Sequence, residues 1–336
     1  MHFSLVKLTP GACPSPAGFD DAILPLYFAL RELGFEAEVR VNSLHPTARN
    51  ILFGANQYRR LPLEHIPRGS IIFNLEQLSS GDIWFTPHYV RMLREFQVWD
   101  YSRRNCEGLK ERFGIGAQHV RLGYMPEMTR IVSPARASFD ALFYGFPNKR
   151  RLDVLKELQQ FGTRLFLPSG PLMGRERDRA IAHSTLVLNI HYYTPATLEM
   201  VRLGYLWANR KAVISECGPD TEIPPGLETA CTYCRYEDLV PGTQRLLRDA
   251  DTRQRQAEKG FRAFSAVSQA DVLREILGTR KYPTCGAGVS WATALNTLAG
   301  DDGDATGRPA AEQVVAALHP TSTAHAPDEA FHAQQQ

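Results

Sequence analysis

The chain has 336 residues, a formal net charge of +2, and 43% hydrophobic residues. This length exceeds one typical hydrophobic core, so we expect two domains. The sequence contains no apolar run of about 18 residues and no signal-peptide pattern at its start, so it predicts neither a membrane-spanning helix nor export by the general route.

The charge is unevenly distributed along the chain. Residues 299–336 hold six acidic residues and one arginine, a sum of −5, which leaves +2 − (−5) = +7 for the remainder. This basic excess could serve an anionic substrate or a peripheral membrane contact, or it could be a solvated basic face. The sequence shows no known nucleic-acid-binding motif, so we expect no nucleic-acid partner.

The first part of the chain alternates strand and helix patterns, which predicts a Rossmann-like domain over residues 1–130. Strands are expected at residues 3–8, 36–41, 50–53, 70–74, 97–100 and 120–122, and helices at 19–33, 87–96 and 105–113. The loop Gly11–Gly18 and Glu76 each follow a strand, so both should lie at the carboxyl edge of this sheet, where ligands bind in open α/β sheets.

After a linker at residues 127–138, a second Rossmann-like domain is predicted over residues 139–280. Strands are expected at residues 139–144, 164–167, 186–190, 212–215 and 230–234, and helices at 148–160, 176–182, 194–209, 236–250, 252–264 and 267–277. The region 299–336 has a low-complexity composition that predicts a disordered tail with a short helix at 310–318. We expect no metal site at Asp302-Gly-Asp304 within that tail.

The stretch Ser184–Glu216 predicts a strand, a helix and a parallel strand. Thr194 is a suitable N-cap for this helix, and Pro195 suits its first position. The free N–H groups of the helix N-terminus, near Thr197 and Leu198, would then favour a bound phosphate. Glu199, expected in the second turn, could accept two hydrogen bonds from a ribose diol, or it could be an ordinary acid near the positive end of the helix dipole.

A second basic segment begins the helix after the strand at 139–144. Asn148 is a candidate N-cap, and Lys149, Arg150 and Arg151 crowd the first turn. Positive charge at this end opposes the helix dipole, and a bound diphosphate would offset that cost. The alternative is three solvated basic side chains.

The six cysteines are scattered, with one close pair, Cys231 and Cys234. A single C-x-x-C lacks the second pair or histidines that a zinc site needs, so we expect reduced thiols and no metal. Reduced thiols fit a cytoplasmic protein.

Three segments together resemble the glycosyltransferase family 1 type C-terminal domain, the donor-binding half of the GT-B glycosyltransferases. They are FYGFPNKRRLDVLKEL, LNIHYYTPATLEMVRLGYLWANRKAVISE and CRYEDLVPGTQRLLRDADTRQRQAEKG. The resemblance covers residues 139–278 well and the earlier residues only through the order of elements. It implies an α/β fold with two Rossmann-like domains facing across a cleft.

The resemblance also implies a nucleotide-sugar donor on the second domain, an acceptor on the first, and no metal or other cofactor. Glu199 matches the family glutamate that holds the ribose, whereas His191 stands where the family often has another glutamate. A histidine there could bind a sugar hydroxyl or the pyrophosphate, or act as an acid or base. Arg150, with Lys149 or Arg151, would hold the diphosphate.

The acceptor would need a base such as Glu76 or Asp20 only if the reaction inverts the anomeric configuration, and the sequence does not decide this. Two other functions stay open. One is a nucleotide-sugar epimerase, and the other is a non-catalytic nucleotide-binding subunit, which the histidine at position 191 would favour.

Overall fold

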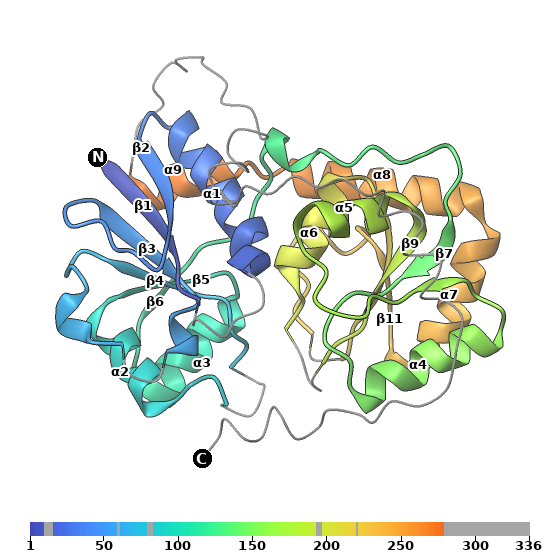
Figure 1. Ribbon diagram of the computed structural model, residues 1–336, viewed down its shortest axis with the longest axis horizontal. Coiled ribbons are helices and arrows are strands. Elements are labelled where there is room, and N and C mark those ends of the chain that lie inside the picture. The colour runs from blue at the N-terminus through green and yellow to red at the C-terminus, as the bar shows by residue number, and fades with distance from the viewer. Residues whose placement is uncertain (10–15, 59–60, 79–82, 193–196, 220, 279–336) are drawn as a thin grey trace, which may run out of the picture. The chain divides into compact units, whose positions relative to one another are not determined.

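The computed structural model describes residues 1–9, 16–58, 61–78, 83–192, 197–219 and 221–278 (Figure 1). All of them belong to the first of two compact units, Met1–Gly288. The predicted disordered tail, its short helix and most of the loop Gly11–Gly18 lie outside the described residues.

The first sheet is parallel throughout, with the strand order β2-β1-β3-β4-β5-β6. Its strands are β1 His2–Lys7, β2 Glu36–Val41, β3 Arg49–Phe53, β4 Ile71–Asn74, β5 Gln97–Asp100 and β6 Ala117–His119. Its helices are α1 Asp20–Glu32, α2 Pro87–Glu95 and α3 Arg103–Phe113. The central strands β3 and β4 are almost entirely buried, as expected for a parallel sheet covered on both faces.

The second sheet is also parallel, with the order β11-β10-β9-β7-β8. Its strands are β7 Phe139–Leu142, β8 Leu165–Phe166, β9 Ser184–Asn189, β10 Ala212–Glu216 and β11 Thr232–Cys234. The helices that follow in this half of the chain are α4 Lys149–Gln160, α5 Gly174–Ala182, α6 Met200–Ala208, α7 Leu239–Arg248, α8 Ala250–Ser265 and α9 Gln269–Leu277. Two parallel sheets with helices confirm the predicted α/β class.

Short 3₁₀ helices occupy several connections: η1 Pro16–Phe19, η2 Ala55–Gln57, η3 Leu63–His65, η4 Pro126–Met128 and η5 Tyr236–Asp238. Side-chain caps fix the start of several helices, since Thr86 accepts from the N–H of Tyr89, and Ser102 from that of Asn105.

The last helix packs against the first one. α9 contacts α1, and the backbone of residues 267–269 hydrogen bonds to Tyr124 in both directions. Gly123 lies so close to this segment that a Cβ there would come within 2.8 Å of the Gln269 nitrogen. Residues 120–122 are therefore not the strand that the sequence predicts, because the chain leaves the sheet after β6 to reach this contact.

The predicted helix over residues 194–209 begins later than expected. α6 starts at Met200 with Glu199 as its N-cap, and Thr194 and Pro195 lie outside the described residues. The N–H of Thr197 donates to Gln77 Oε1, 3.1 Å away, and Gln77 Nε2 donates to the Thr197 carbonyl at 3.2 Å. This pair holds Thr197 in a non-helical conformation.

The predicted helix over 236–250 is also divided, into η5 and α7. None of the described helices combines the length and the apolar character needed to cross a membrane.

Candidate functional site

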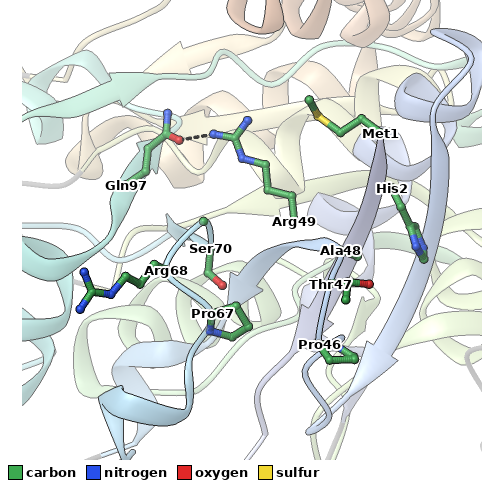
Figure 2. A pocket seen from close by; sticks show the side chains of 11 residues that line it. Met1, His2, Pro46, Thr47, Ala48, Arg49, Pro67, Arg68, Ser70 and Gln97 are labelled. Carbon is green, nitrogen blue, oxygen red and sulfur yellow. Dashed lines mark hydrogen bonds between the residues drawn. The ribbon is translucent and has the colours of Figure 1, made fainter.

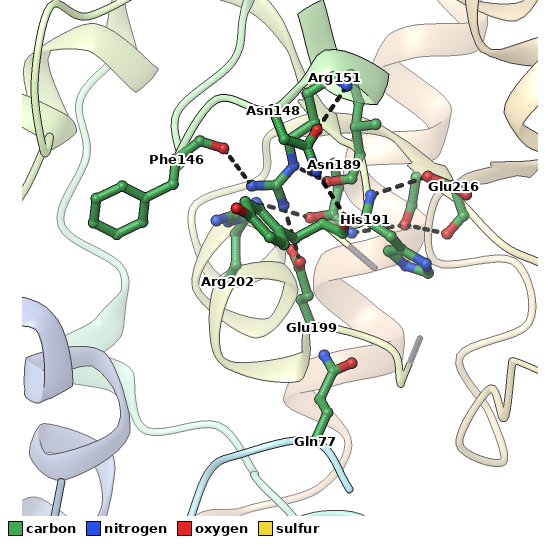
Figure 3. Close-up of polar contacts among 12 residues, drawn as sticks. Gln77, Phe146, Asn148, Arg151, Asn189, His191, Glu199, Arg202 and Glu216 are labelled. Atoms are coloured by element: carbon green, nitrogen blue, oxygen red, sulfur yellow. Dashed lines mark hydrogen bonds and ion pairs between the residues drawn. The ribbon is translucent and has the colours of Figure 1, made fainter. Parts of the chain in front are cut away.

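Six charged or titratable side chains gather at the carboxyl edge of the second sheet, beside the N-terminus of α4 (Figure 3). They come from α4, from the segments that follow β9 and from the end of β10. They are Arg150, Arg151, His191, Glu199, Arg202 and Glu216.

Arg150 and Glu216 form the first ion pair of this cluster. Both guanidinium Nη groups contact the carboxylate, with Nη1 2.6 Å from Oε2. Nη1 also donates to the carbonyl of His191 at 3.1 Å, and Glu216 Oε2 accepts from the backbone N–H of His191 at 3.0 Å. The guanidinium lies over the ring of Tyr236, 4.0 Å from its centroid. Arg150 is therefore oriented from several sides, while 22% of its side chain stays exposed.

Glu199 forms the second group, with two arginines. Arg202 Nη1 lies 2.9 Å from Glu199 Oε2, and Arg151 Nη2 lies 3.5 Å from Oε1. Glu199 is the N-cap residue of α6 and makes no side-chain cap hydrogen bond, so the sequence-based position in the second turn is wrong. Its carboxylate is instead shared by two cations.

The contacts of Arg151 are mainly with backbone carbonyls. Nε donates to Ile190 at 2.9 Å and Nη1 to Phe146 at 2.8 Å. Burial lowers the pKa of Arg151 to about 10, an effect that the Glu199 carboxylate opposes. Arg151 thus joins the loop after β7 to the segment after β9, which makes it a structural part of the cluster.

His191 is buried, and its Nε2 has no hydrogen-bond partner among the described residues. Burial lowers its pKa, and Glu199 and Glu216 oppose that effect. At neutral pH the imidazole is therefore uncharged, and its buried Nε2 has an unused capacity for one hydrogen bond.

Of the remaining residues predicted to bind the donor, one caps α4, one lies outside the cluster and two belong to the segment before α6. Asn148 caps α4 by accepting from the Arg151 N–H at 2.9 Å, as predicted. Lys149 is exposed and pairs with Asp153 one turn along α4, at 2.8 Å, so it does not join the cluster. Leu198 is buried, and the Thr197 N–H is already bound to Gln77, so the predicted phosphate site on these two amides has no free N–H at Thr197.

Arg202 and Glu216 are functional candidates that the sequence-based predictions do not include. Glu216 is the last residue of β10, and Glu76 comes shortly after β4. The criterion of an acid at the carboxyl end of a strand, which indicates Glu76, therefore also applies to Glu216. Arg202 is three residues after Glu199, a spacing that brings side chains together on a helix.

In the first sheet, Glu76 follows β4 and accepts a hydrogen bond from Asn56 Nδ2 at 2.9 Å. Burial raises the pKa of Glu76 to about 7, although the Asn56 hydrogen bond opposes this. A carboxyl group with this pKa is half ionised near neutral pH, which suits a general base. Asp20, the other candidate base, is paired with the buried Lys7 at 2.9 Å.

A buried polar network holds the segment after β4 in place. Asn74 Nδ2 donates to Asp100 Oδ2 at 2.6 Å, and Asn105 Nδ2 donates to the Glu76 carbonyl at 2.8 Å. Gln77, the next residue, makes the two hydrogen bonds to Thr197. The network thus connects the position of Glu76 to the segment that leads into Glu199.

Among the described residues, His2, Glu38 and His45 come close enough together to hold a metal ion, with ligand atoms within 4.8 Å of one another. However, His45 Nδ1 accepts from the N–H groups of Thr47 and Ala48, at 3.2 and 2.9 Å. The neutral ring then carries its proton on Nε2, so neither nitrogen offers a free lone pair. The geometry does not favour a metal at this cluster.

No protein-family model and no curated protein sequence matches the chain. Solved structures resemble it through their fold. WaaG, a glycosyltransferase involved in lipopolysaccharide biosynthesis, is 11% identical, with 82% of this chain and 98% of that chain covered and a TM-score of 0.54. Sucrose-phosphate synthase from Thermosynechococcus elongatus is 12% identical, with 82% and 97% covered and a TM-score of 0.51.

HepE from Anabaena, solved in complex with UDP-glucose, is 11% identical, with 82% of this chain and 98% of that chain covered and a TM-score of 0.54. These structures are GT-B glycosyltransferases, and the likeness extends over both sheets. The chain therefore has the two-sheet α/β fold of the GT-B glycosyltransferases, as the resemblance of its sequence implies.

Proposed function

We propose that this protein is a glycosyltransferase that takes its sugar from a nucleotide-activated donor bound at the carboxyl edge of the second sheet. The observation that carries the proposal is the cluster around the start of α4. Its three arginines, Arg150, Arg151 and Arg202, outnumber its two glutamates, and its histidine is uncharged at neutral pH. The cluster therefore has one net positive charge and favours an anion such as a diphosphate.

The fold supports the same donor class by analogy. HepE, whose fold is similar, was solved with UDP and with UDP-glucose. Fold alone does not define an activity, so the residues of this chain have to supply the donor site. Glu199 keeps 20% of its side chain exposed, and its role in the proposal is to accept a hydrogen bond from the ribose diol.

Four residues have distinct roles in the proposed reaction. Departure of the nucleoside diphosphate builds negative charge, which Arg150 and Arg202 would stabilise as fixed cations without a metal ion. The uncharged His191 would hydrogen bond the donor through Nε2. Glu76 would deprotonate the acceptor if the anomeric configuration inverts. We also propose a cytoplasmic location, which the free thiols of the four described cysteines support.

The test measures binding of UDP, GDP and ADP, and of their sugar conjugates, by titration calorimetry. We expect one nucleotide to bind the wild type, and Glu199→Gln to weaken it about tenfold or more, because a charged hydrogen-bond acceptor is lost. Glu258→Gln is the matched control. Glu258 lies on α8, outside the cluster, and it also pairs with two arginines, Arg210 and Arg262. Equal stability of the two variants to urea would exclude a folding effect.

Product analysis separates the remaining functions. A transferase consumes the donor in the presence of an acceptor or slowly hydrolyses it, an epimerase converts the donor alone, and a binding subunit does neither. Binding of no nucleotide by the wild type, or equal binding by wild type and Glu199→Gln, would contradict the proposed donor site.

A further inference from the structure

A cavity of about 540 Å³ opens at the amino edge of the first sheet, where β1, β3, β4 and β5 begin (Figure 2). It lies at the edge opposite to the carboxyl ends of those strands and is formed by the first residues of β1, β3 and β5 and by the segments that precede β1, β3 and β4. Its lining includes Arg49, Arg68, Ser70 and Gln97.

The lining of this cavity is basic. It contains two arginines and no aspartate or glutamate. Arg49, the first residue of β3, donates one hydrogen bond to the amide oxygen of Gln97, the first residue of β5. Within the described part of the chain, no ion pair joins Arg49 or Arg68 to a carboxylate, so both keep their charge for another partner.

One residue of the lining also carries a buried hydroxyl group without a partner. Ser70 precedes β4, is 1% exposed, and its Oγ has no hydrogen-bond partner among the described residues. The backbone N–H of Ser70 is used differently, because it donates to the carbonyl of Pro67 at 2.9 Å. A buried polar group without a partner destabilises the folded protein, and a ligand that accepts a hydrogen bond from this hydroxyl would remove that cost.

We propose that this cavity binds a phosphate-type oxyanion, held by the guanidinium groups of Arg49 and Arg68 and by the hydroxyl of Ser70. Arginine matches the paired oxygens of such an anion, and charge-assisted hydrogen bonds are the strong ones. A cation is disfavoured because the lining has no carboxylate. The volume exceeds that of a single phosphate, so the oxyanion can be one group of a larger molecule. The site is separate from the proposed donor site, which belongs to the second sheet.

In the first test, inorganic phosphate is titrated into the full chain at low ionic strength, and binding is measured by titration calorimetry. We expect saturable binding that Arg49→Gln and Arg68→Gln each weaken about tenfold, because each removes a charged donor. Arg136→Gln, which replaces an exposed arginine outside the cavity, should bind phosphate as the wild type does. Phosphate binding that Arg150→Gln weakens and that Arg49→Gln and Arg68→Gln leave unchanged would belong to the second sheet and would overturn the proposal.

Ser70→Ala distinguishes a ligand contact from a structural role. Removing a hydroxyl that lacks a partner should leave the urea midpoint of the free protein unchanged or higher, while phosphate affinity falls. Loss of stability in the free protein together with unchanged phosphate affinity would show that Ser70 serves the fold and would overturn its place in the site.

The source of the oxyanion is tested separately with vesicles of phosphatidylglycerol and of phosphatidylcholine. Sedimentation with the anionic vesicles alone, reversed by phosphate and lost in Arg49→Gln, would identify a lipid headgroup. Phosphate binding without sedimentation would identify a phosphate-bearing solute. If neither phosphate nor anionic vesicles bind, or if Arg49→Gln and Arg136→Gln behave alike, the proposal fails.

Discussion

Lys211 is a buried cation with no salt bridge among the described residues. It is 7% exposed and lies between α6 and β10, and burial alone lowers its pKa to about 8. Below that pH the folded protein must hold a charged ammonium in a poorly hydrated place, which the unfolded chain does not. The position therefore costs stability at neutral pH.

We predict that Lys211→Met raises the unfolding free energy at pH 7 by about 2 kcal/mol. The sign follows from linkage. The folded pKa is depressed, so the unfolded state binds more protons between about pH 8 and 10.5, and wild-type stability rises through that range. The advantage of the variant over wild type should therefore shrink as pH rises, measured by urea denaturation at pH 7 and pH 10.

Lys156→Met, on the exposed face of α4, is the control for this prediction and should show no such convergence. If Lys211→Met destabilised the protein at pH 7, the ammonium would have a stabilising partner, and the assignment of burial as the dominant effect would be wrong.

Single residues also show what the sequence could reveal of the site. Arg150 and Arg151 are predicted from the charge in the first turn of one helix, and Glu199 from its place early in another, so each has a local signal. The carboxylate partner of Arg150 has no such local signal, because Glu216 is 66 residues away along the chain. Residue type and local position predict which groups can bind an anion, whereas only the packing of β9 against β10 determines which of them pair.

At the scale of elements, Asn148 joins two segments at the candidate site. Its Oδ1 accepts from the Arg151 N–H at 2.9 Å and caps α4, and its Nδ2 donates to the Tyr192 carbonyl at 2.9 Å. We predict that Asn148→Ala lowers the unfolding free energy by about 1 kcal/mol, the usual cost of a lost cap. Urea denaturation should show a lower midpoint with an unchanged slope.

Asn148→Asp is the matched variant for this prediction. Aspartate caps a helix as well as asparagine does, so it should recover the cap contribution while losing only the hydrogen bond to Tyr192. Equal destabilisation by alanine and aspartate would assign the effect to the Tyr192 contact and not to the cap.

Most elements were predictable because their signals are local. Apolar runs mark the strands, and caps such as Ser102 and Asn148 mark helix starts. The predicted start of α6 is wrong because a contact from a distant part of the sequence intervenes. Gln77, 120 residues earlier, occupies the N–H of Thr197, and no pattern near Thr197 shows this. The strand expected at residues 120–122 failed similarly, because that segment approaches residues 267–269.

At the scale of the whole molecule, the order of strands and helices predicts two parallel sheets, because each crossover helix returns the chain in the same direction. The return of α9 to α1 was not foreseen, since helix periodicity shows that a helix has an apolar face but not which surface covers it. The segment at residues 123–124 and the one at 267–269 meet through backbone hydrogen bonds and through the Gln269 side chain, which accepts from the Gly123 N–H at 2.7 Å. The two segments are far apart in the sequence, so no local pattern indicates this contact.

Two carboxyl groups with raised pKa values, one buried and one half-buried, give the protein a particular pH dependence. Burial raises the pKa of Glu76 and of Asp100 to about 7, and in each case hydrogen bonds from neighbouring asparagines oppose the effect. In the unfolded chain these groups ionise at lower pH, from model values of 4.5 and 3.8. Their contribution to stability is therefore fully present below the unfolded pKa and is lost as pH rises through about 7.

We predict that Glu76→Gln, compared with wild type, gains about 2 kcal/mol of unfolding free energy between pH 5 and pH 8. Glutamine can still accept from Asn56 Nδ2 but cannot ionise, so the variant avoids the cost of a buried carboxylate. Urea denaturation at several pH values measures the difference, and Glu157→Gln, an exposed change on α4, should leave the pH dependence of wild type unaltered. A difference that stays constant with pH would mean that Glu76 ionises in the folded protein as it does in the unfolded chain. Glu76 would then be fully charged at neutral pH, and it would lose the matched pKa on which its proposed role as the acceptor's base depends.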